Sequence, residues 1–183
     1  MPLHSIIFDT REAKLRDCFS PELPIKVEPL TIGDIIFSSE LLKDVIIFER
    51  KSLSDLLASI KDGRYEEQSH RLIHSSGVAP HRIMYIIEGM FSTLRNPAEK
   101  QLVISAMTSL QLYKGFSVIR TSSVQETADF IAGMWKKMKR NEEKGVNLYT
   151  PVTQSQTEEP DSAQNQDSAQ ETTQVQAYCS VVK

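Results

Sequence analysis

The stretch VIIFERKSLSDLLASIKDGRYEEQ, residues 45–68, decides the fold. It begins with the β-branched and apolar run Val45–Phe48, and a short run of this kind favours a buried strand. The strand ends in three charged residues, Glu49, Arg50 and Lys51. Because side chains alternate between the two faces of a strand, we expect Glu49 and Lys51 on one face and Arg50 on the other. The stretch therefore predicts a buried strand with a charged end.

Two helices are predicted after this strand. Residues 52–60 place leucines and an isoleucine on one helical face, and Ser52 with Asp55 three residues later is typical of a helix start. Gly63 favours a left-handed turn that ends this helix. A second helix is predicted over Arg64–His74.

The remaining elements are predicted from the same patterns. Further strands are expected at Ser5–Asp9, Ile25–Glu28, Asp34–Phe37, Arg82–Glu88 and Phe116–Arg120, and further helices at Ala13–Phe19, from Pro97 to about Tyr113, and after Ser123 to about Arg140. The second, third and fourth strands along the chain are Ile25–Glu28, Asp34–Phe37 and the strand that begins at Val45. They follow one another without room for crossover helices, so we expect them to be antiparallel neighbours. Strands first, then helices alternating with strands, predict an α/β fold with a mixed central sheet flanked by helices.

Charge and composition divide the chain in two. Residues 1–140 hold 19 basic and 17 acidic side chains, whereas residues 141–183 hold 2 and 7. The segment 141–183 is also polar, and burial of its few apolar groups cannot offset an ordering cost of about 1–2 kcal/mol per residue. We therefore expect one domain over residues 1–140 and an acidic, disordered tail over 141–183.

Targeting signals and cysteine patterns favour an intracellular protein. The two cysteines, Cys18 and Cys179, are too far apart in the chain to suggest a disulfide framework or a zinc site. No signal peptide opens the sequence, and no apolar run approaches the roughly 20 residues that a membrane span needs. We expect a protein without a membrane segment, nuclear if the source is eukaryotic or viral.

Carboxylates at the ends of several predicted strands point to metal-assisted chemistry. Hydrolysis of a phosphodiester bond requires an activated water molecule and neutralised charge at the phosphate, and divalent cations held by carboxylates supply both. Asp34 follows Gly33 at the start of a strand, and with Glu49 it could hold Mg²⁺ or Mn²⁺. Lys51 would then orient or deprotonate the attacking water. Taken singly, each of these acids is also compatible with an ordinary turn or surface role.

Other acids could join the same edge of the sheet. Asp9 and Glu12 follow the first predicted strand and are candidates for further ligands or for water-holding groups. Asp55 has a competing role, because it is also the acid of the capping box that Ser52 opens.

Taken together, these motifs resemble the nuclease domain of the XPF/Mus-type structure-specific endonucleases. The matching motifs are Asp9-Thr10-Arg11-Glu12, Gly33-Asp34, Glu49-Arg50-Lys51 with Asp55, and Gly63-Arg64-Tyr65 with Gln68 and Arg71. Their order and approximate spacing agree with the family over about residues 5–140. The resemblance implies a restriction-endonuclease-like core, dependence on Mg²⁺ or Mn²⁺, and cleavage of branched, flapped or nicked DNA in repair or recombination.

The resemblance also implies roles for individual residues. Asp34 and Glu49 would bind the metal, Lys51 would be catalytic, and Arg50 and Asp55 would support the site. Members of the family pair through the C-terminal helices of this domain, which implies a homodimer or a heterodimer here. The residues Met134, Trp135 and Met138 fit either such an interface or the core.

DNA-binding residues are expected on the second helix of the opening stretch. Arg64, Gln68 and Arg71 share one helical face and could contact the phosphate backbone, although an exposed polar face is an alternative. Two other functions stay open. The chain could be a non-catalytic subunit that binds DNA or a partner. Since no helix-hairpin-helix modules follow Arg140, it could also be a phosphodiesterase for RNA or small nucleotides.

Overall fold

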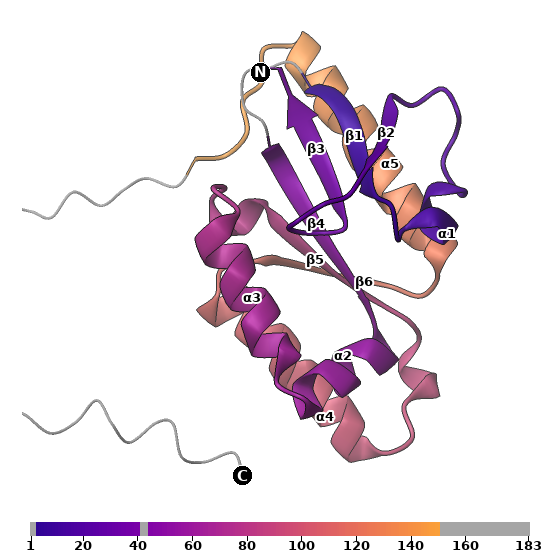
Figure 1. Cartoon of the computed structure of the whole chain (residues 1–183), viewed down its shortest axis with the longest axis vertical. Coiled ribbons are helices and arrows are strands. Elements are labelled where there is room, and N and C mark those ends of the chain that lie inside the picture. Colours follow the sequence, from indigo (N-terminus) through magenta and orange to yellow (C-terminus); the bar gives the residue numbers. More distant parts are fainter. Residues whose placement is uncertain (1–2, 41–43, 151–183) are drawn as a thin grey trace, which may run out of the picture. The chain divides into compact units, whose positions relative to one another are not determined.

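The structure is a computed structural model that describes residues 3–40 and 44–150 (Figure 1). The residues up to Leu148 form one unit, and those from Tyr149 onward form a second, of which residues 149–150 are described. The predicted disordered tail lies, from residue 151, outside the described residues, so it stays a prediction.

Six strands form a single sheet, and their bounds are β1 Leu3–Asp9, β2 Ile25–Glu28, β3 Ile35–Ser39, β4 Asp44–Ser52, β5 Ile83–Glu88 and β6 Ser117–Thr121. The strand order is β2-β1-β3-β4-β5-β6. Strand β3 runs antiparallel to both of its neighbours, while the pairs β1–β2, β4–β5 and β5–β6 are parallel. The start of β3 therefore lies at the same edge of the sheet as the ends of β1 and β4.

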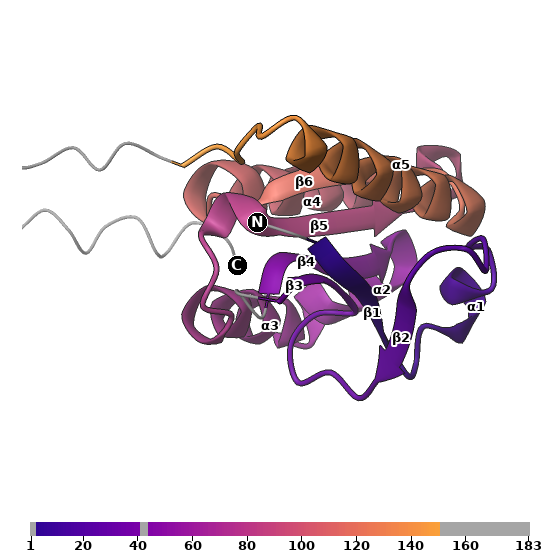
Figure 2. The same cartoon turned by 90° about the horizontal axis from the view of Figure 1, so that it is seen from above.

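The helices are α1 Ala13–Arg16, α2 Leu53–Lys61, α3 Arg64–Ser75, α4 Pro97–Thr108 and α5 Val124–Glu143, with short 3₁₀ turns η1 Pro80–Arg82 and η2 Phe91–Thr93 and a π-helical turn η3 Ser109–Tyr113. Figure 2 shows α3 and α5 on opposite sides of the sheet. No helix within residues 3–40 and 44–150 is long and apolar enough to cross a membrane. The predicted mixed sheet flanked by helices is confirmed.

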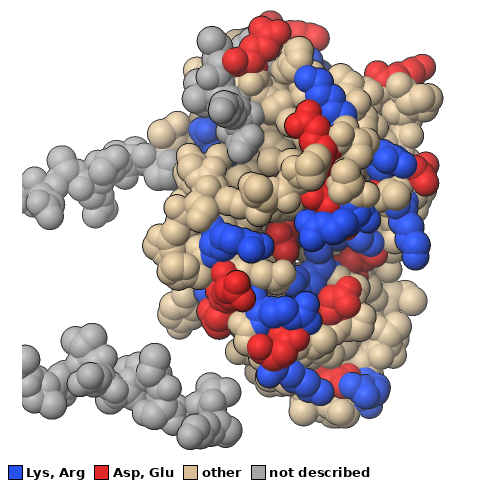
Figure 3. All heavy atoms as spheres, in the orientation of Figure 1, with Lys and Arg blue, Asp and Glu red and all other residues tan. Residues whose placement is uncertain are grey.

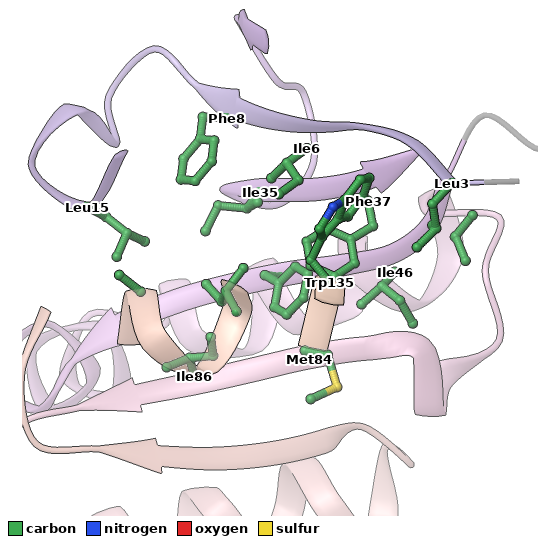
Figure 4. Close-up of a cluster of buried hydrophobic side chains, with 14 residues drawn as sticks. Leu3, Ile6, Phe8, Leu15, Ile35, Phe37, Ile46, Met84, Ile86 and Trp135 are labelled. Atoms are coloured by element: carbon green, nitrogen blue, oxygen red, sulfur yellow. The ribbon is translucent and has the colours of Figure 1, made fainter. Parts of the chain in front are cut away.

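Strand alternation divides the core into two layers. Phe37 and Phe48 face α1 and α5, where Trp135 packs edge-on against Phe37 with ring centroids 5.1 Å apart (Figure 4). Ile47 and Tyr85 face the other way, toward α2, α3 and α4. On α5, Trp135 is part of this first layer of the core, and the partly buried Met134 and Met138 pack against it. These three residues of α5 therefore belong to the core, one of the two alternatives that their pattern allowed.

Most predicted strands match to within about three residues at each end, and the larger differences concern one strand and two helix ends. The strand Ile25–Glu28 does not pair with β3; it is the parallel neighbour of β1 at the edge of the sheet, because residues 10–24 are long enough for a crossover. Helix α1 ends at Arg16 rather than at Phe19. Helix α5 continues to Glu143, beyond the expected end at Arg140.

Candidate active site

Gly33 and Asp34 bring β3 into register with the end of β4. The backbone N–H of Asp34 donates to the carbonyl oxygen of Phe48 at 2.7 Å. Gly33 has φ +71°, and a Cβ there would lie 2.5 Å from the Ile47 side chain and 3.0 Å from the carbonyl oxygen of Phe48. Only glycine meets both conditions. The Gly-Asp pair is thus a steric requirement for placing the Asp34 carboxylate beside β4.

Asp34 and Glu49 meet at one edge and on one face of the sheet. Ile36, two residues after Asp34, and Ile47, two residues before Glu49, both face the α2–α3 layer. Alternation places Asp34, Glu49 and Lys51 on that same face. The carboxylate of Asp34 also accepts the backbone N–H of Arg50 at 2.7 Å, which ties it to β4. The predicted convergence of two acids and one lysine is therefore present in the geometry.

The two carboxylates raise the free energy of each other's charged form. Burial and then the nearby charge of Asp34 raise the pKa of Glu49 to about 8, although Lys51 and Arg71 oppose the shift. Burial is also the main cause that raises the pKa of Asp34, against the N–H of Arg50 that lowers it. Two acids in this state gain stability from a positive charge between them.

The residues at this edge fit a hard divalent cation. Their donor atoms are carboxylate oxygens, the ligands that Mg²⁺ and Mn²⁺ prefer. In the part of the chain that the structure describes, no donor is hydrogen-bonded to the carboxylate of Glu49. Within that same part, no three His, Cys, Asp or Glu side chains gather as a ready ligand set. Among the described residues, the Asp34–Glu49 pair is therefore the part of the site that would hold such a cation.

Lys51 lies beside the acid pair and is held by helix α3. The residue is 7% exposed, and its Nζ donates to Oε1 of Gln68. Gln68 was predicted as a DNA contact, and its contact with the lysine is a feature that the sequence pattern did not indicate. The lysine therefore has a fixed position next to Glu49.

Arg50 lies on the opposite face of β4, as alternation predicts. Its guanidinium donates to Glu88 through Nε at 2.9 Å and Nη2 at 2.6 Å, and to Glu12 through Nη1 at 3.1 Å. Glu88 also accepts the hydroxyl of Thr127 on α5 at 2.7 Å. This network joins β4, β5 and α5, so the side chain of Arg50 acts on the scaffold, while its backbone N–H contacts Asp34. Glu88 is the last residue of β5, and it was not identified from the sequence as part of the site.

Glu12 and Asp9 both have partners already. The bond from Arg50 holds the carboxylate of Glu12, whose pKa is raised mainly by burial. The carboxylate of Asp9 accepts Arg11 Nε at 2.6 Å, the Arg11 N–H at 2.9 Å and the Leu30 N–H at 2.8 Å. The Arg11 hydrogen bond is the main reason that the pKa of Asp9 falls to about 2. Asp9 thus ties the end of β1 to the loop before β3.

Asp55 is hydrogen-bonded to the N-cap residue Ser52 at the exposed start of α2. Its backbone N–H donates to the Ser52 hydroxyl at 3.1 Å, and its Oδ2 accepts that hydroxyl at 2.7 Å. Ser52 is therefore the N-cap, Asp55 supports it through the bond to its hydroxyl, and the supporting role of Asp55 in catalysis stays a prediction.

The basic residues of α3 differ in their distance from the acids. Arg71 is exposed and close enough to lower the pKa of Glu49. Arg64 pairs instead with Asp62, at 2.6 Å, and both side chains are exposed. Figure 3 shows basic and acidic side chains close together over the middle and lower part of the visible face. The predicted DNA-binding residues therefore share α3, but they have different partners: Gln68 contacts Lys51, Arg71 lies near Glu49, and Arg64 pairs with Asp62.

Comparison with known proteins agrees with this geometry. The ERCC4 domain model matches residues 8–134. The crossover junction endonuclease MUS81 of Debaryomyces hansenii is 33% identical over 150 residues, covering 73% of this chain and 23% of that protein. The structure-specific endonuclease subunit MUS81 of Rattus norvegicus is 33% identical over 142 residues, covering 71% and 25%. The chain thus spans about a quarter of the length of these curated relatives.

Solved structures show the same fold. XPF from Aeropyrum pernix in complex with DNA has a TM-score of 0.59 and 26% sequence identity, over 74% of this chain and 65% of that one. A further structure of the Aeropyrum pernix XPF has a TM-score of 0.58 and 27% identity. The fold, the matched model and the relatives agree, and the chain belongs to the ERCC4 domain family, with an XPF/MUS81-type, restriction-endonuclease-like nuclease domain.

Proposed function

We propose that the chain is a metal-dependent endonuclease that hydrolyses phosphodiester bonds in branched, flapped or nicked DNA. The observation that carries the proposal is the meeting of Asp34, Glu49 and Lys51 on one face at one edge of the sheet. The names of the relatives, crossover junction endonuclease and structure-specific endonuclease subunit, support DNA as the substrate. Action on DNA would place the chain inside the cell, in the nucleus of a eukaryotic host.

Each residue has a role in the proposed hydrolysis. Asp34 and Glu49 hold Mg²⁺ or Mn²⁺, which supplies charge neutralisation and a more acidic water molecule when bound. Lys51 donates a hydrogen bond to the attacking water and balances the negative charge that develops at the phosphate. Arg71 lies beside the acids, where its guanidinium can pair with a phosphate oxygen of the backbone.

A nuclease assay on flap, fork and nicked-junction DNA tests this function. Cleavage by the wild-type chain is expected with Mg²⁺ or Mn²⁺ and should stop when a chelator removes the metal. Asp34→Asn and Glu49→Gln each remove a ligand charge and should lower the cleavage rate by at least about 100-fold. Asp129→Asn, an exposed acid on α5, is the matched control and should cleave like wild type.

The same assay separates the alternatives. Single-stranded RNA and cyclic nucleotides belong in the substrate panel, because hydrolysis of these alone would make the chain a phosphodiesterase of another class. Cleavage that persists in the Glu49→Gln variant would remove the site assignment. DNA binding without any cleavage would favour a non-catalytic subunit.

We also propose that the chain forms a homodimer or a heterodimer through the face of α4 and η3. Large apolar side chains are exposed there, with Leu112 at 73% and Tyr113 at 84% exposure, and Ile104 of α4 lines a shallow pocket together with Leu112. The apolar residues of α5, in contrast, pack onto the sheet. The prediction that the last two helices form the interface is therefore narrowed to the α4–η3 face.

A further inference from the structure

Lys51 reaches the candidate site from β4, but its ammonium group is fixed by a residue of α3. The ammonium group donates to the side-chain carbonyl of Gln68, and the lysine side chain is almost entirely buried. A lysine side chain has four rotatable bonds, so an unanchored ammonium would sample many positions. The contact with Gln68 selects one of them.

The chemistry of the two groups fixes the orientation of the amide. An ammonium group has only donors, so the Gln68 atom that faces it must be the carbonyl oxygen. The NH₂ end of the same amide consequently points away from Lys51. No other orientation of Gln68 satisfies the lysine.

The part of α3 that carries Gln68 is held in place through its neighbouring residues. The hydroxyl of Ser69, which is fully buried, accepts a hydrogen bond from Lys114 Nζ at 2.6 Å. Lys114 also pairs with Glu66 at 2.7 Å, and Tyr65 donates to the carbonyl oxygen of Ala106 at 3.0 Å. These bonds tie α3 to α4 and to the residue after η3. The amide of Gln68 therefore stands on a fixed support rather than on a mobile surface helix.

We propose that Gln68 is a positioning residue for catalysis, which acts by holding the Lys51 ammonium group beside Asp34 and Glu49. The proposal rests on the proposed function, and it gives Gln68 a role other than a contact with DNA. A positioning residue changes the rate of the chemical step, whereas a DNA contact changes affinity. The two roles can therefore be separated by experiment.

The first test is single-turnover cleavage by Gln68→Met, which keeps the length and the helix propensity of the side chain but removes the acceptor. The rate at saturating enzyme should fall about 10- to 100-fold, as for other groups that orient a reactive side chain. The affinity for DNA, measured with Ca²⁺ in place of Mg²⁺, should stay within about threefold, because no DNA contact is removed. Glu67→Met, at the exposed neighbouring position, is the matched control and should behave as wild type.

A double-mutant cycle adds the decisive comparison. If Gln68 acts through Lys51, the Lys51→Met/Gln68→Met variant should cleave no more slowly than Lys51→Met alone. A double variant slower than Lys51→Met by the full factor of Gln68→Met would overturn the proposal. So would a Gln68→Met variant that loses affinity but keeps its rate at saturation. Gln68→Ala removes the same acceptor and serves if the methionine variant does not fold.

Failure of the proposed function can be recognised separately. A wild-type chain that cleaves no substrate of the panel contradicts the endonuclease assignment, and the lysine is then examined by ¹⁵N NMR. A hydrogen-bonded, buried ammonium group should give a slowly exchanging signal, assigned by its absence in Lys51→Met. Loss of this signal in Gln68→Met, but not in Glu67→Met, is expected. An unchanged signal would refute the anchoring of Lys51 by Gln68.

Discussion

A left-handed backbone and a close neighbour both require glycine at position 33, and comparison with Gly77 separates the two requirements. The backbone is left-handed, and the side chain of Ile47 lies where a Cβ would be. Gly77 has a similar φ of +69° but open space around it. Alanine at either position carries the strain of the left-handed backbone, while alanine at Gly33 alone also meets a steric clash.

We therefore predict that Gly33→Ala destabilises the fold far more than Gly77→Ala. The expected losses are about 1 kcal/mol for Gly77→Ala and about 3 kcal/mol for Gly33→Ala, measured by denaturant unfolding. Equal losses would mean that the close approach of Ile47 and Phe48 has no energetic weight.

Asp9 gives a second prediction at the scale of the residue. Its side chain is 3% exposed and accepts hydrogen bonds from the 73%-exposed Arg11 and from Leu30. Asp9→Asn removes the charge from these bonds and should lower the free energy of unfolding by about 2 kcal/mol. Asp17→Asn, in an exposed pair with Arg16, should be neutral in the same measurement.

Some of the site could be foreseen from single residues and some could not. Alternation along one strand was sufficient to separate Arg50 from Glu49 and Lys51, since it needs only local geometry. The pairing of Arg50 with Glu88, and of Lys51 with Gln68, depends on which strand and helix lie alongside β4. That information lies in the tertiary packing, which the local pattern does not contain.

At the scale of the element, the helix starts were the most predictable features. Ser52, Asn96 and Ser123 each accept the backbone N–H of the residue three positions on, and all three helices begin directly after these residues, where the sequence predicted them. Strand β2 was assigned the wrong neighbour because most of it is exposed, so its side chains carry no pattern that identifies a partner. The π-helical end of α4 has no sequence signal that we recognise.

The start of α4 leads to a prediction about pH. The carboxylate of Glu99 accepts the backbone N–H of Arg95, and this bond is the main reason that its pKa lies below 4.5. A lowered pKa in the folded state means that the charged carboxylate stabilises the fold at pH values above the unfolded-state pKa of about 4.5. This contribution is lost as the pH falls through the pKa of the folded state.

Glu99→Gln should therefore melt at a lower temperature than wild type at pH 7, and the difference should shrink below about pH 4. Thermal unfolding followed by circular dichroism at several pH values measures it. Glu143→Gln is the control, because its carboxylate lies at the C-terminal end of α5, where a negative charge is unfavourable. A gap for Glu99→Gln that is independent of pH would contradict the cause given for the shift.

At the scale of the whole molecule, the exposed apolar face of α4 and η3 predicts association. Leu112→Asp places a charge at a 73%-exposed position of this face without touching the core, so the monomer should keep its melting temperature while the dimer dissociates. Sedimentation of both proteins at tens of micromolar measures this. Met90→Asp is the control, because Met90 is exposed but lies outside α4 and η3. A wild-type chain that is monomeric, with no partner, would exclude the interface.

The hairpin of β3 and β4 has a consequence for changes in chain length. A slip of one residue in this pairing would turn Glu49 away and bring Arg50 beside Asp34, so an anion would be exchanged for a cation. The irregularity in the pairing lies between Phe37 and Ser38, at the far end from Gly33. A change in chain length beside this irregularity would leave the pairing of Ile35–Phe37 with Ile46–Phe48 in register, while the same change near Gly33 would abolish the acid pair.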